Sequence, residues 1–372
     1  MITVESSVQV YRNPRPELVA RHAWHPSLIR LGADEWLCTF DLGQGPEAHD
    51  YRTYTSRSLD GGDTWSEPEP MLAPEPPPRA THTVRVTRLR DGTLRGFGAR
   101  FVRSDPAQGL INHPGLGYCD CELISTRSDD RGRTWSAPAV VVPPLRAPAF
   151  ETCHAPVELS DGRILLPTST WIGWDGEGAE GMRAVAFVSS DGGHTWPTHL
   201  DEFDRWAEGI VSWEQSIAEL GDGRLVAVVW SLDTRTGTTL PSTYAVAAQR
   251  EHFGPARENG ILAQTMKLAP LGGDRILAVY RRHDTPGLWA STAEVGTSWV
   301  TEQTCPLWLG AGSGMAGSGA VGSELSALQF GYPSIVVENE RSAALAFWCK
   351  EEDLYGIRVL RLRLTAAGTE RD

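Results

Sequence analysis

The pattern Ser-x-Asp-x-Gly-x-Thr-Trp occurs three times in this 372-residue chain, at residues 58–65, 128–135 and 189–196. Successive copies lie 70 and 61 residues apart. One copy is ordinary turn chemistry, because Asp bonds its own backbone and Gly accepts a positive φ. Three copies indicate a repeat architecture in which each copy marks one supersecondary unit. We expect each copy to close a hairpin, with a structural rather than a catalytic role for its Asp.

A second signal, the dipeptide Asp-Gly, runs in phase with the first. It begins at residues 91, 161 and 222, so its copies are also 70 and 61 residues apart. Each copy separates two short apolar runs, which predicts strand, two-residue turn, strand. Weaker versions at 32–35, 272–274 and 339–340 raise the number of expected hairpins to six. The six hairpins start near Trp24, Thr83, Cys153, Glu214, Thr265 and Tyr332.

The repeated motif resembles the Asp-box, or BNR repeat, of the sialidase (neuraminidase) superfamily. The resemblance implies an all-β fold, a six-bladed β-propeller with four antiparallel strands per blade. No stretch looks like an interdomain linker, so residues 1–372 are expected to form one sialidase-like domain. Closure of the ring should pair a strand from one terminus with the other terminal blade. The candidates for that pairing are residues 8–11 and 357–364.

Composition narrows the classes of partner. The net charge of −13 argues against nucleic acid and anionic membranes. Residues 1–15 contain no apolar leader and no segment reaches transmembrane length, which favours a cytoplasmic location.

Most of the six cysteines fall in strand-like runs, as reduced buried thiols do. Cys38 and Cys349 occupy equivalent strands of the first and last blades, where a disulfide is sterically conceivable. We expect a short helix within 201–208 and a Gly- and Ser-rich loop at 311–319.

The innermost strand of each blade lines the axis of a propeller, and its start forms the mouth of a central pocket. Alignment on the Asp-Gly turns places one residue of each blade at this position. These residues are His25, Thr83, Cys153, Glu214, Thr265 and Tyr332. Their neighbours are Trp24, His82, Arg85, Glu151, His154, Gln215 and Lys267. Converging polar groups of this kind are what a ligand pocket needs.

Two axis-facing residues match the family pattern. The run W-E-Q-S-I-A-E-L-G-D-G-R-L at 213–225 is similar to the segment whose Glu opens the fourth blade of sialidases. The run F-G-Y-P-S-I at 330–335 is similar to the one whose Tyr opens the sixth. The resemblance implies that Glu214 deprotonates Tyr332, which attacks the anomeric carbon. A phenol has a pKa near 10, so a nucleophilic Tyr needs an adjacent base.

The acid/base and the three arginines of the family pattern are matched only in part. The resemblance places the acid/base in the loop 41–52, where Asp50 and Glu47 are the candidates. Sialidases hold the substrate carboxylate with three arginines, since guanidinium pairs bidentately with carboxylate. This chain has His25-Pro26-Ser27 at the first position and Trp230 at the second. Blade five offers Lys267, Arg281 and Arg282 for the third. A glycan other than sialic acid is therefore expected.

Substrate-binding candidates are the polar and aromatic side chains expected at or beside the mouth. They are His25, His82, Arg85, His154, Lys267, Trp24, Trp171 and Arg100. The axis-facing rows are neutral to positive, and their charge should rise as the histidines protonate near pH 6.5. A cationic pocket inside an acidic shell favours an acidic glycan over a neutral one. We expect neither a cofactor nor a metal ion.

The function that these residues predict is an exo-acting, sialidase-like glycoside hydrolase with a Tyr332–Glu214 pair. One alternative is a propeller-type polysaccharide lyase or rhamnosidase-like enzyme, because His or Tyr can take a sugar proton while Arg or Lys stabilises the enolate. A second alternative is a glycan-binding propeller without catalysis. The expected partner is a glycan in every case, and the sequence carries no signal of oligomeric state.

Overall fold

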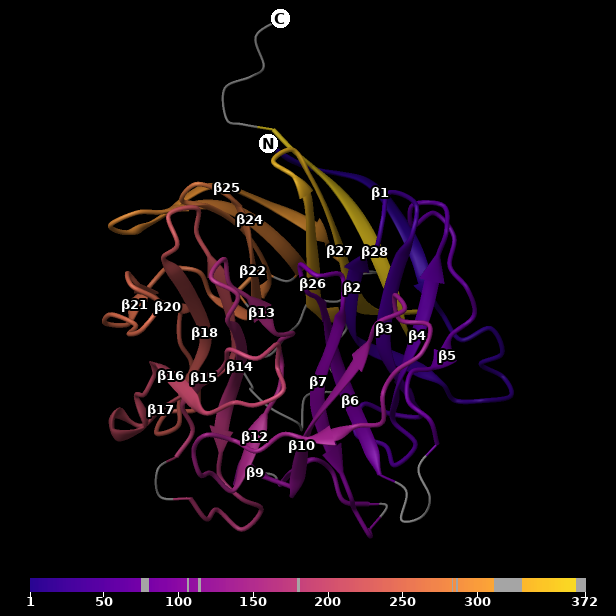
Figure 1. The fold of residues 1–372 in the computed structure, drawn as a ribbon, viewed down its shortest axis with the longest axis horizontal. Helices are drawn as coiled ribbons and strands as arrows, with labels where there is room; N and C mark the ends of the chain where they lie inside the picture. The colour runs from indigo at the N-terminus through magenta and orange to yellow at the C-terminus, as the bar shows by residue number, and fades with distance from the viewer. Residues whose placement is uncertain are drawn as a thin grey trace, which may run out of the picture.

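The computed structural model describes residues 1–74, 80–105, 107–112, 115–178, 181–282, 284–285, 287–310 and 330–365. The expected loop at 311–319 lies outside these residues. The described chain forms six antiparallel sheets of four or five strands, one after another, as the repeats predict. Strands of neighbouring sheets contact each other around a ring, and the inner strand of the last sheet contacts that of the first. The expected six-bladed β-propeller is confirmed (Figure 1).

Each blade is a consecutive part of the chain, except that blade six takes its outer strand from the N-terminus. Blade one is β2 (His22–Arg30), β3 (Trp36–Gly43), β4 (Arg52–Ser58) and β5 (Glu69–Pro70). Blade two is β6 (Thr81–Arg88), β7 (Leu94–Phe101), β10 (Cys121–Ser128) and β11 (Ala139–Val140). Blade three is β12 (Ala149–Glu151) with β13 (Val157–Glu158), then β14 (Ile164–Trp171), β15 (Ala184–Ser189) and β16 (Thr198–Phe203).

The second half of the ring follows the same order. Blade four is β17 (Ile210–Glu219), β18 (Leu225–Asp233) with β19 (Thr238–Thr239), β20 (Thr243–Ala247) and β21 (Arg257–Glu258). Blade five is β22 (Ala263–Gly272), β23 (Arg275–Arg282), β24 (Gly287–Val295) and β25 (Trp299–Trp308). Blade six is β26 (Phe330–Asn339), β27 (Ser342–Glu351), β28 (Leu354–Leu364) and β1 (Ile2–Tyr11). A small hairpin of β8 (Ile111–Asn112) and β9 (Gly117–Tyr118) extends from blade two.

Pairing between the chain ends closes the ring. Strand β1 runs antiparallel to β28, from Ile2 opposite Leu364 to Tyr11 opposite Ile357. Figure 1 shows the indigo β1 beside the yellow β27 and β28. The expected closure is therefore confirmed, with a longer N-terminal strand than residues 8–11.

The three motif turns join the third and fourth strands of blades one, two and three. In the first turn, Ser58 Oγ donates to Asp60 at 2.7 Å and accepts from the Gly62 N–H at 2.7 Å. Asp60 also accepts from the Thr64 N–H at 2.9 Å. The turns at Asp130 and Asp191 repeat these bonds. The bonds account for the conserved spacing within the motif, and they give each Asp a structural role.

The Asp-Gly turns differ from the two-residue loop that the sequence predicts. The Leu89 N–H bonds the Thr93 carbonyl at 2.8 Å, which leaves three residues in the loop. The third, Gly92, has φ +90°. This is a three-residue hairpin loop whose last position is left-handed, so the glycine is required there. The turns at Gly162 and Gly223 have the same bonds.

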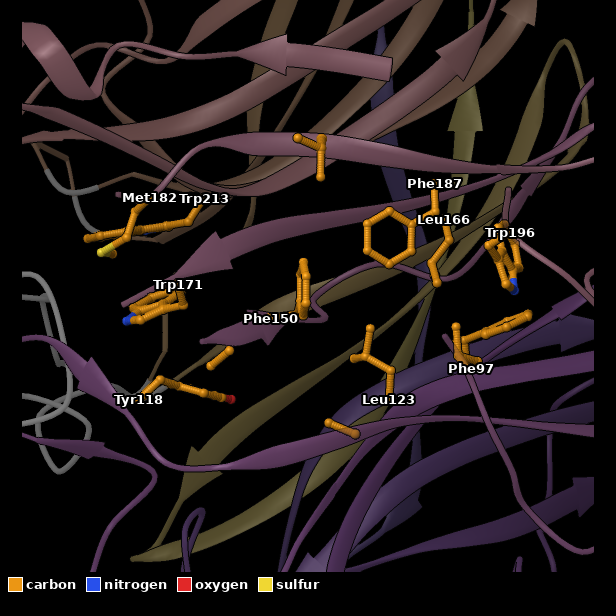
Figure 2. Packing of buried hydrophobic residues seen from close by; sticks show 14 of the residues in the cluster. Phe97, Tyr118, Leu123, Phe150, Leu166, Trp171, Met182, Phe187, Trp196 and Trp213 are labelled. Carbon is orange, nitrogen blue, oxygen red and sulfur yellow. The ribbon is translucent and has the colours of Figure 1, made fainter. Parts of the chain in front are cut away.

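Apolar side chains from facing blades fill the space between neighbouring sheets. Figure 2 shows one such layer, in which Trp171 of β14 lies between Trp213 of β17 and Tyr118 of β9. The Trp171 and Trp213 rings are stacked with centroids 5.4 Å apart. All six cysteines are free, so Cys38 and Cys349 form no disulfide. In the described residues the helix expected within 201–208 is a single 3₁₀ turn, Trp206–Glu208, because 198–203 pairs as β16.

Candidate functional site

All six axis-facing residues line one cavity at the centre of the ring. We call this cavity the upper cavity, and its volume is about 210 Å³. Its lining includes the axis-facing residue of each blade, namely His25, Thr83, Cys153, Glu214, Thr265 and Tyr332. The Asp-Gly alignment therefore placed the pocket-lining position of every blade correctly.

Four of these residues hold a left-handed backbone that is unusual for their type. His25, Glu214, Thr265 and Tyr332 have φ between +50° and +52°. Each sits where the register between the first and second strands of its blade shifts by one residue. These shifts are β-bulges, which re-aim side chains next to functional sites. Positive φ outside glycine is strained and clusters at ligand and catalytic sites.

A buried carboxylate, Asp41 at the end of β3, organises one wall of the cavity. It accepts hydrogen bonds from Arg85 at 2.9 Å, Tyr51 at 2.8 Å and Thr83 at 2.7 Å. Burial opposes the charge of Asp41, but the Arg85 guanidinium and further hydrogen bonds outweigh it and hold its pKa well below the usual range. Asp41 is therefore ionised at neutral pH, and it fixes both Arg85 and Tyr51.

Tyr332 lies at the floor of the upper cavity between two cations. Its hydroxyl accepts a hydrogen bond from Arg85 Nε at 2.9 Å and donates to the Cys153 carbonyl. The Arg85 guanidinium lies 4.8 Å, and Lys267 Nζ 4.9 Å, from the ring centroid. Burial raises the pKa of Tyr332, and Arg85 opposes that rise. In this arrangement Glu214 is not the partner of the hydroxyl.

Glu214 and Glu151 bring two carboxyl groups to the same cavity. Glu214 accepts from the Thr265 hydroxyl at 2.9 Å. Glu151 ends β12 and is 7% exposed, and neither of its carboxyl oxygens has a hydrogen-bond partner of normal geometry within the described residues. Burial raises the pKa of Glu151, the neighbouring Glu214 raises it further, and Lys267 and the Glu214 peptide group oppose the rise. Glu151 is thus a buried carboxyl on a residue that lines the upper cavity.

Not every candidate residue reaches the upper cavity. Those that line it are Tyr332, Glu214, Glu47, His25, Arg85 and Trp171. Asp50 is exposed and accepts from the Gln44 N–H, outside the lining. Arg100 pairs with Glu122 at 2.6 Å. Trp24 and His82 are buried outside this lining, because residues next to an axis-facing position point to the other side of a strand.

Two further candidates lie on the far side of Tyr332. His154 and Lys267 line a second, larger cavity of about 770 Å³, the lower cavity. Arg85, Cys153 and Tyr332 line both cavities and so form the partition between them. Lys267 Nζ donates to the Cys153 carbonyl at 2.7 Å from below. These two residues, expected at the mouth of the pocket, therefore line the lower cavity and not the upper one.

The expected rise in positive charge through histidine protonation is also not met. Burial lowers the pKa of His154 to about 3, and Lys267 adds to that effect. Burial likewise lowers the pKa of His25, against the opposing hydrogen bond with Asp41. Both shifts disfavour the protonated, charged form of the ring.

Sequence reasoning missed several residues of the site. Asp41 and Tyr51 hold His25, whose Nδ1 lies 2.5 Å from Tyr51 Oη. Trp213 and Gln264 line the wall. An Asp within the otherwise apolar run W-L-C-T-F-D-L at 36–42 was an available signal for a buried charge. Gln264 carried no such signal.

Aromatic side chains make up much of the remaining wall. They are Phe101, Tyr118, Trp171, Trp213, Trp230 and Trp348. A concave, largely aromatic wall with a few polar groups is typical of a small-molecule site. Across the described ranges, no three His, Cys, Asp or Glu side chains are grouped as a metal site requires. None of the described helices is long and apolar enough to span a membrane.

The sequence comparisons give one match to a curated protein. No family model matches the chain. A stretch of 147 residues, 39% of the chain, is 33% identical to a sialidase of Micromonospora viridifaciens. The match spans only 20% of that protein.

The structural comparisons agree on the fold. A protein of unknown function from Dyadobacter fermentans aligns over 98% of this chain and 99% of its own, with a TM-score of 0.73 and 19% identity. A Hadza microbial sialidase gives a TM-score of 0.64 at 16% identity, over 92% of this chain and 66% of its own. The leech intramolecular trans-sialidase gives 0.64 at 11% identity, over 97% and 70%. At these identities the structural likeness establishes the fold alone.

Proposed function

Because this chain has the six-bladed propeller fold of the sialidase superfamily, we propose that it is a carbohydrate-active enzyme, an exo-acting glycoside hydrolase. Tyr332 is the proposed nucleophile and Glu214 its base. The observation that carries the proposal is the position of Tyr332, at the floor of the upper cavity between Arg85 and Lys267. Arg85 opposes the rise that burial causes in the pKa of Tyr332, and an adjacent base is still needed to take the proton from a Tyr nucleophile.

In the proposed reaction the sugar ring enters from the upper mouth and rests against the aromatic wall. Tyr332 Oη attacks the anomeric carbon, and its proton passes to Glu214. The leaving oxygen takes a proton from an acid, for which Glu47 at the cavity is better placed than the exposed Asp50. Water then cleaves the glycosyl–tyrosine bond. Catalytic hydrogen bonds often tighten only when substrate binds, so Tyr332 must leave the Cys153 carbonyl for Glu214.

The test is turnover of an aryl glycoside panel, read by product mass. We expect Glu214→Gln to lower kcat by roughly 10²–10⁴-fold, the range for loss of a general acid or base. Tyr332→Phe should lower it at least as far and should abolish any covalent glycosyl adduct in the intact-protein mass. Tyr54→Phe is the matched control, because Tyr54 lies on β4 outside the cavity. Nearly unchanged turnover in Tyr332→Phe would refute the nucleophile.

A second candidate function is a polysaccharide lyase. His25 contacts Tyr51, which donates to Asp41, and such a chain can hold a neutral imidazole ready to take a proton from a sugar carbon. A lyase gives unsaturated uronate products, whose ultraviolet absorbance and mass differ from those of hydrolysis. His25→Asn should then abolish activity while Tyr332→Phe leaves part of it. A glycan-binding propeller without catalysis predicts binding and no product from any substrate.

A further inference from the structure

Three side chains at the upper cavity leave buried polar atoms without a hydrogen-bond partner of normal geometry among the described residues. They are both carboxyl oxygens of Glu151, Nε2 of Gln264 and Nε1 of Trp230. The residues are 7%, 1% and 8% exposed, and they come from blades three, five and four. Buried polar groups in folded proteins are nearly always paired, so unpaired ones on residues that line a cavity point to a missing partner.

The unpaired atoms are chemically complementary to hydroxyl groups. A carboxyl group accepts hydrogen bonds and, when protonated, also donates one, whereas an amide NH₂ and an indole N–H only donate them. A ligand that both donates and accepts satisfies all three residues, and adjacent sugar hydroxyls do so. Trp171, Trp213 and Trp230 provide apolar faces in the same cavity.

The cations of the cavity are already engaged. Arg281 donates through Nε and Nη2 to Gln264 Oε1, at 3.1 and 2.8 Å, and through Nη1 to the Phe330 carbonyl. Arg85 is bound to Asp41, whose charge balances its own. A ligand carboxylate would therefore meet no open guanidinium pair, and it would lie near Glu214 and Glu151.

We infer that the upper cavity binds an uncharged, hydroxyl-rich sugar ring, with one hydroxyl donating to Glu151 and others accepting from Gln264 and Trp230. The inference rests on the proposed function for the ligand being a sugar, and it names the class of that sugar. It replaces the acidic glycan expected from the sequence. Glu151 and Gln264 are accordingly residues that determine specificity for hydroxyl groups.

The experiment measures binding rather than turnover, by quenching of intrinsic tryptophan fluorescence in the Tyr332→Phe protein. The probes are methyl glycosides of neutral hexoses and 6-deoxyhexoses, the matching methyl uronides, and N-acetylneuraminic acid. We expect at least one neutral glycoside to bind about 10-fold or more tightly than its uronide, since a carboxylate would be buried here without a partner.

Variants at residue 151 separate the carboxyl's role from its effect on folding. Glu151→Leu should weaken the neutral glycoside about 10-fold, the effect of losing one buried hydrogen bond. Glu151→Gln keeps the shape and an acceptor, so it should change neutral binding little and bring the uronide closer to it. Glu158→Gln is the control, because Glu158 lies on β13 at the lower cavity. Unchanged binding in Glu151→Leu would overturn the assignment.

The outcomes distinguish this inference from the proposed function. Tighter binding of uronides or N-acetylneuraminic acid, with Tyr332-dependent turnover in the wild type, overturns the neutral-sugar inference and leaves the hydrolase intact. Neutral binding without turnover supports the inference and overturns the hydrolase. No binding of any sugar overturns both, and the unpaired atoms are then satisfied by water alone.

Discussion

At the scale of single residues, Glu202 has a buried carboxyl group that lies outside the candidate site. It lies in β16 between Asp201 and Phe203, where the register against β15 shifts by one residue. It is 5% exposed, and neither carboxyl oxygen has a partner within the described part of the chain. Burial raises its pKa well above the ordinary value. The extra residue of a bulge has no opposite neighbour, so no ladder partner compensates for its burial.

This shift predicts a pH-dependent loss of stability that Glu202→Gln removes. A carboxyl whose folded pKa is raised supports stability fully below its unfolded pKa, about 4.3, and that support is lost as pH rises through the folded pKa. The loss is roughly 1.4 kcal/mol per pH unit across that window. Urea midpoints between pH 4 and 7 should thus fall less steeply in Glu202→Gln than in the wild type.

Glu208→Gln is the control for that measurement. Glu208 is an exposed ion-pair partner of Arg205, and such pairs contribute about 1 kcal/mol or less. Its pH profile should match the wild type. Parallel profiles for the Glu202 variant and the wild type would show that Glu202 finds a partner or water in solution.

The position of each axis-facing residue could be predicted, because a turn signal recurs at the same distance from it in each blade. Glu214 and Tyr332 were found from position in the repeat, and both line the upper cavity. Their hydrogen bonds could not be predicted, since Tyr332 bonds Arg85 and Cys153, which lie far from it in sequence. The protonation of His154 was misjudged because its burial depends on packing from several blades.

At the scale of elements, the motif turn is a hydrogen-bonded unit that belongs to stability and not to ligand binding. Asp130 accepts from the Thr134 N–H at 2.9 Å and its hydroxyl at 2.6 Å, and Ser128 Oγ donates to it. Its neighbour Asp129 binds only the exposed side chain of Arg127 in the described structure. The two adjacent carboxylates therefore form a matched pair for experiment.

We expect Asp130→Ala to lower the free energy of unfolding by about 1–2 kcal/mol, because it removes several net-favourable hydrogen bonds of a tight turn. Asp129→Ala should cost about 0.5 kcal/mol or less. Urea denaturation measures both, and sugar binding should be unchanged in both. Equal effects of the two substitutions would contradict the structural role of the motif Asp.

Hairpins were easier to predict than loops because a turn is encoded locally. The Asp-Gly signal located the first two strands of blades two, three and four, although each of these turns closes a three-residue loop that ends at Gly92, Gly162 or Gly223. Blades four to six lack the complete motif, yet their sheets form. Pairing between neighbouring strands and apolar packing between blades evidently suffice there.

The whole molecule depends on contacts between its ends. Strand β28 pairs with β27 on one side and with the N-terminal β1 on the other. The apolar layer that contains Leu360 and Leu362 of β28 also contains Leu277 and Val279 of β23 in blade five. The number of blades was predictable from the spacing of the turns. The length of β1 was not, because no turn motif follows residues 2–7 to mark them as part of a hairpin. Closure therefore joins local repeats into one cooperative ring.

Removal of β28 should unfold the ring rather than only its last blade. A chain ending at residue 354 loses the partner of β1 and exposes the edge of β27, so Ile2, Val10 and Tyr11 lose their burial. Burying a large apolar side chain contributes about 1.5–3 kcal/mol, and natural domains are stable by only about 5–15 kcal/mol in total. Near-ultraviolet circular dichroism and thermal melting should show loss of tertiary structure throughout. A chain ending at Thr365 keeps β28 whole and is the control. If the shorter chain still melted cooperatively at the wild-type temperature, β1–β28 pairing would not be what holds the ring closed.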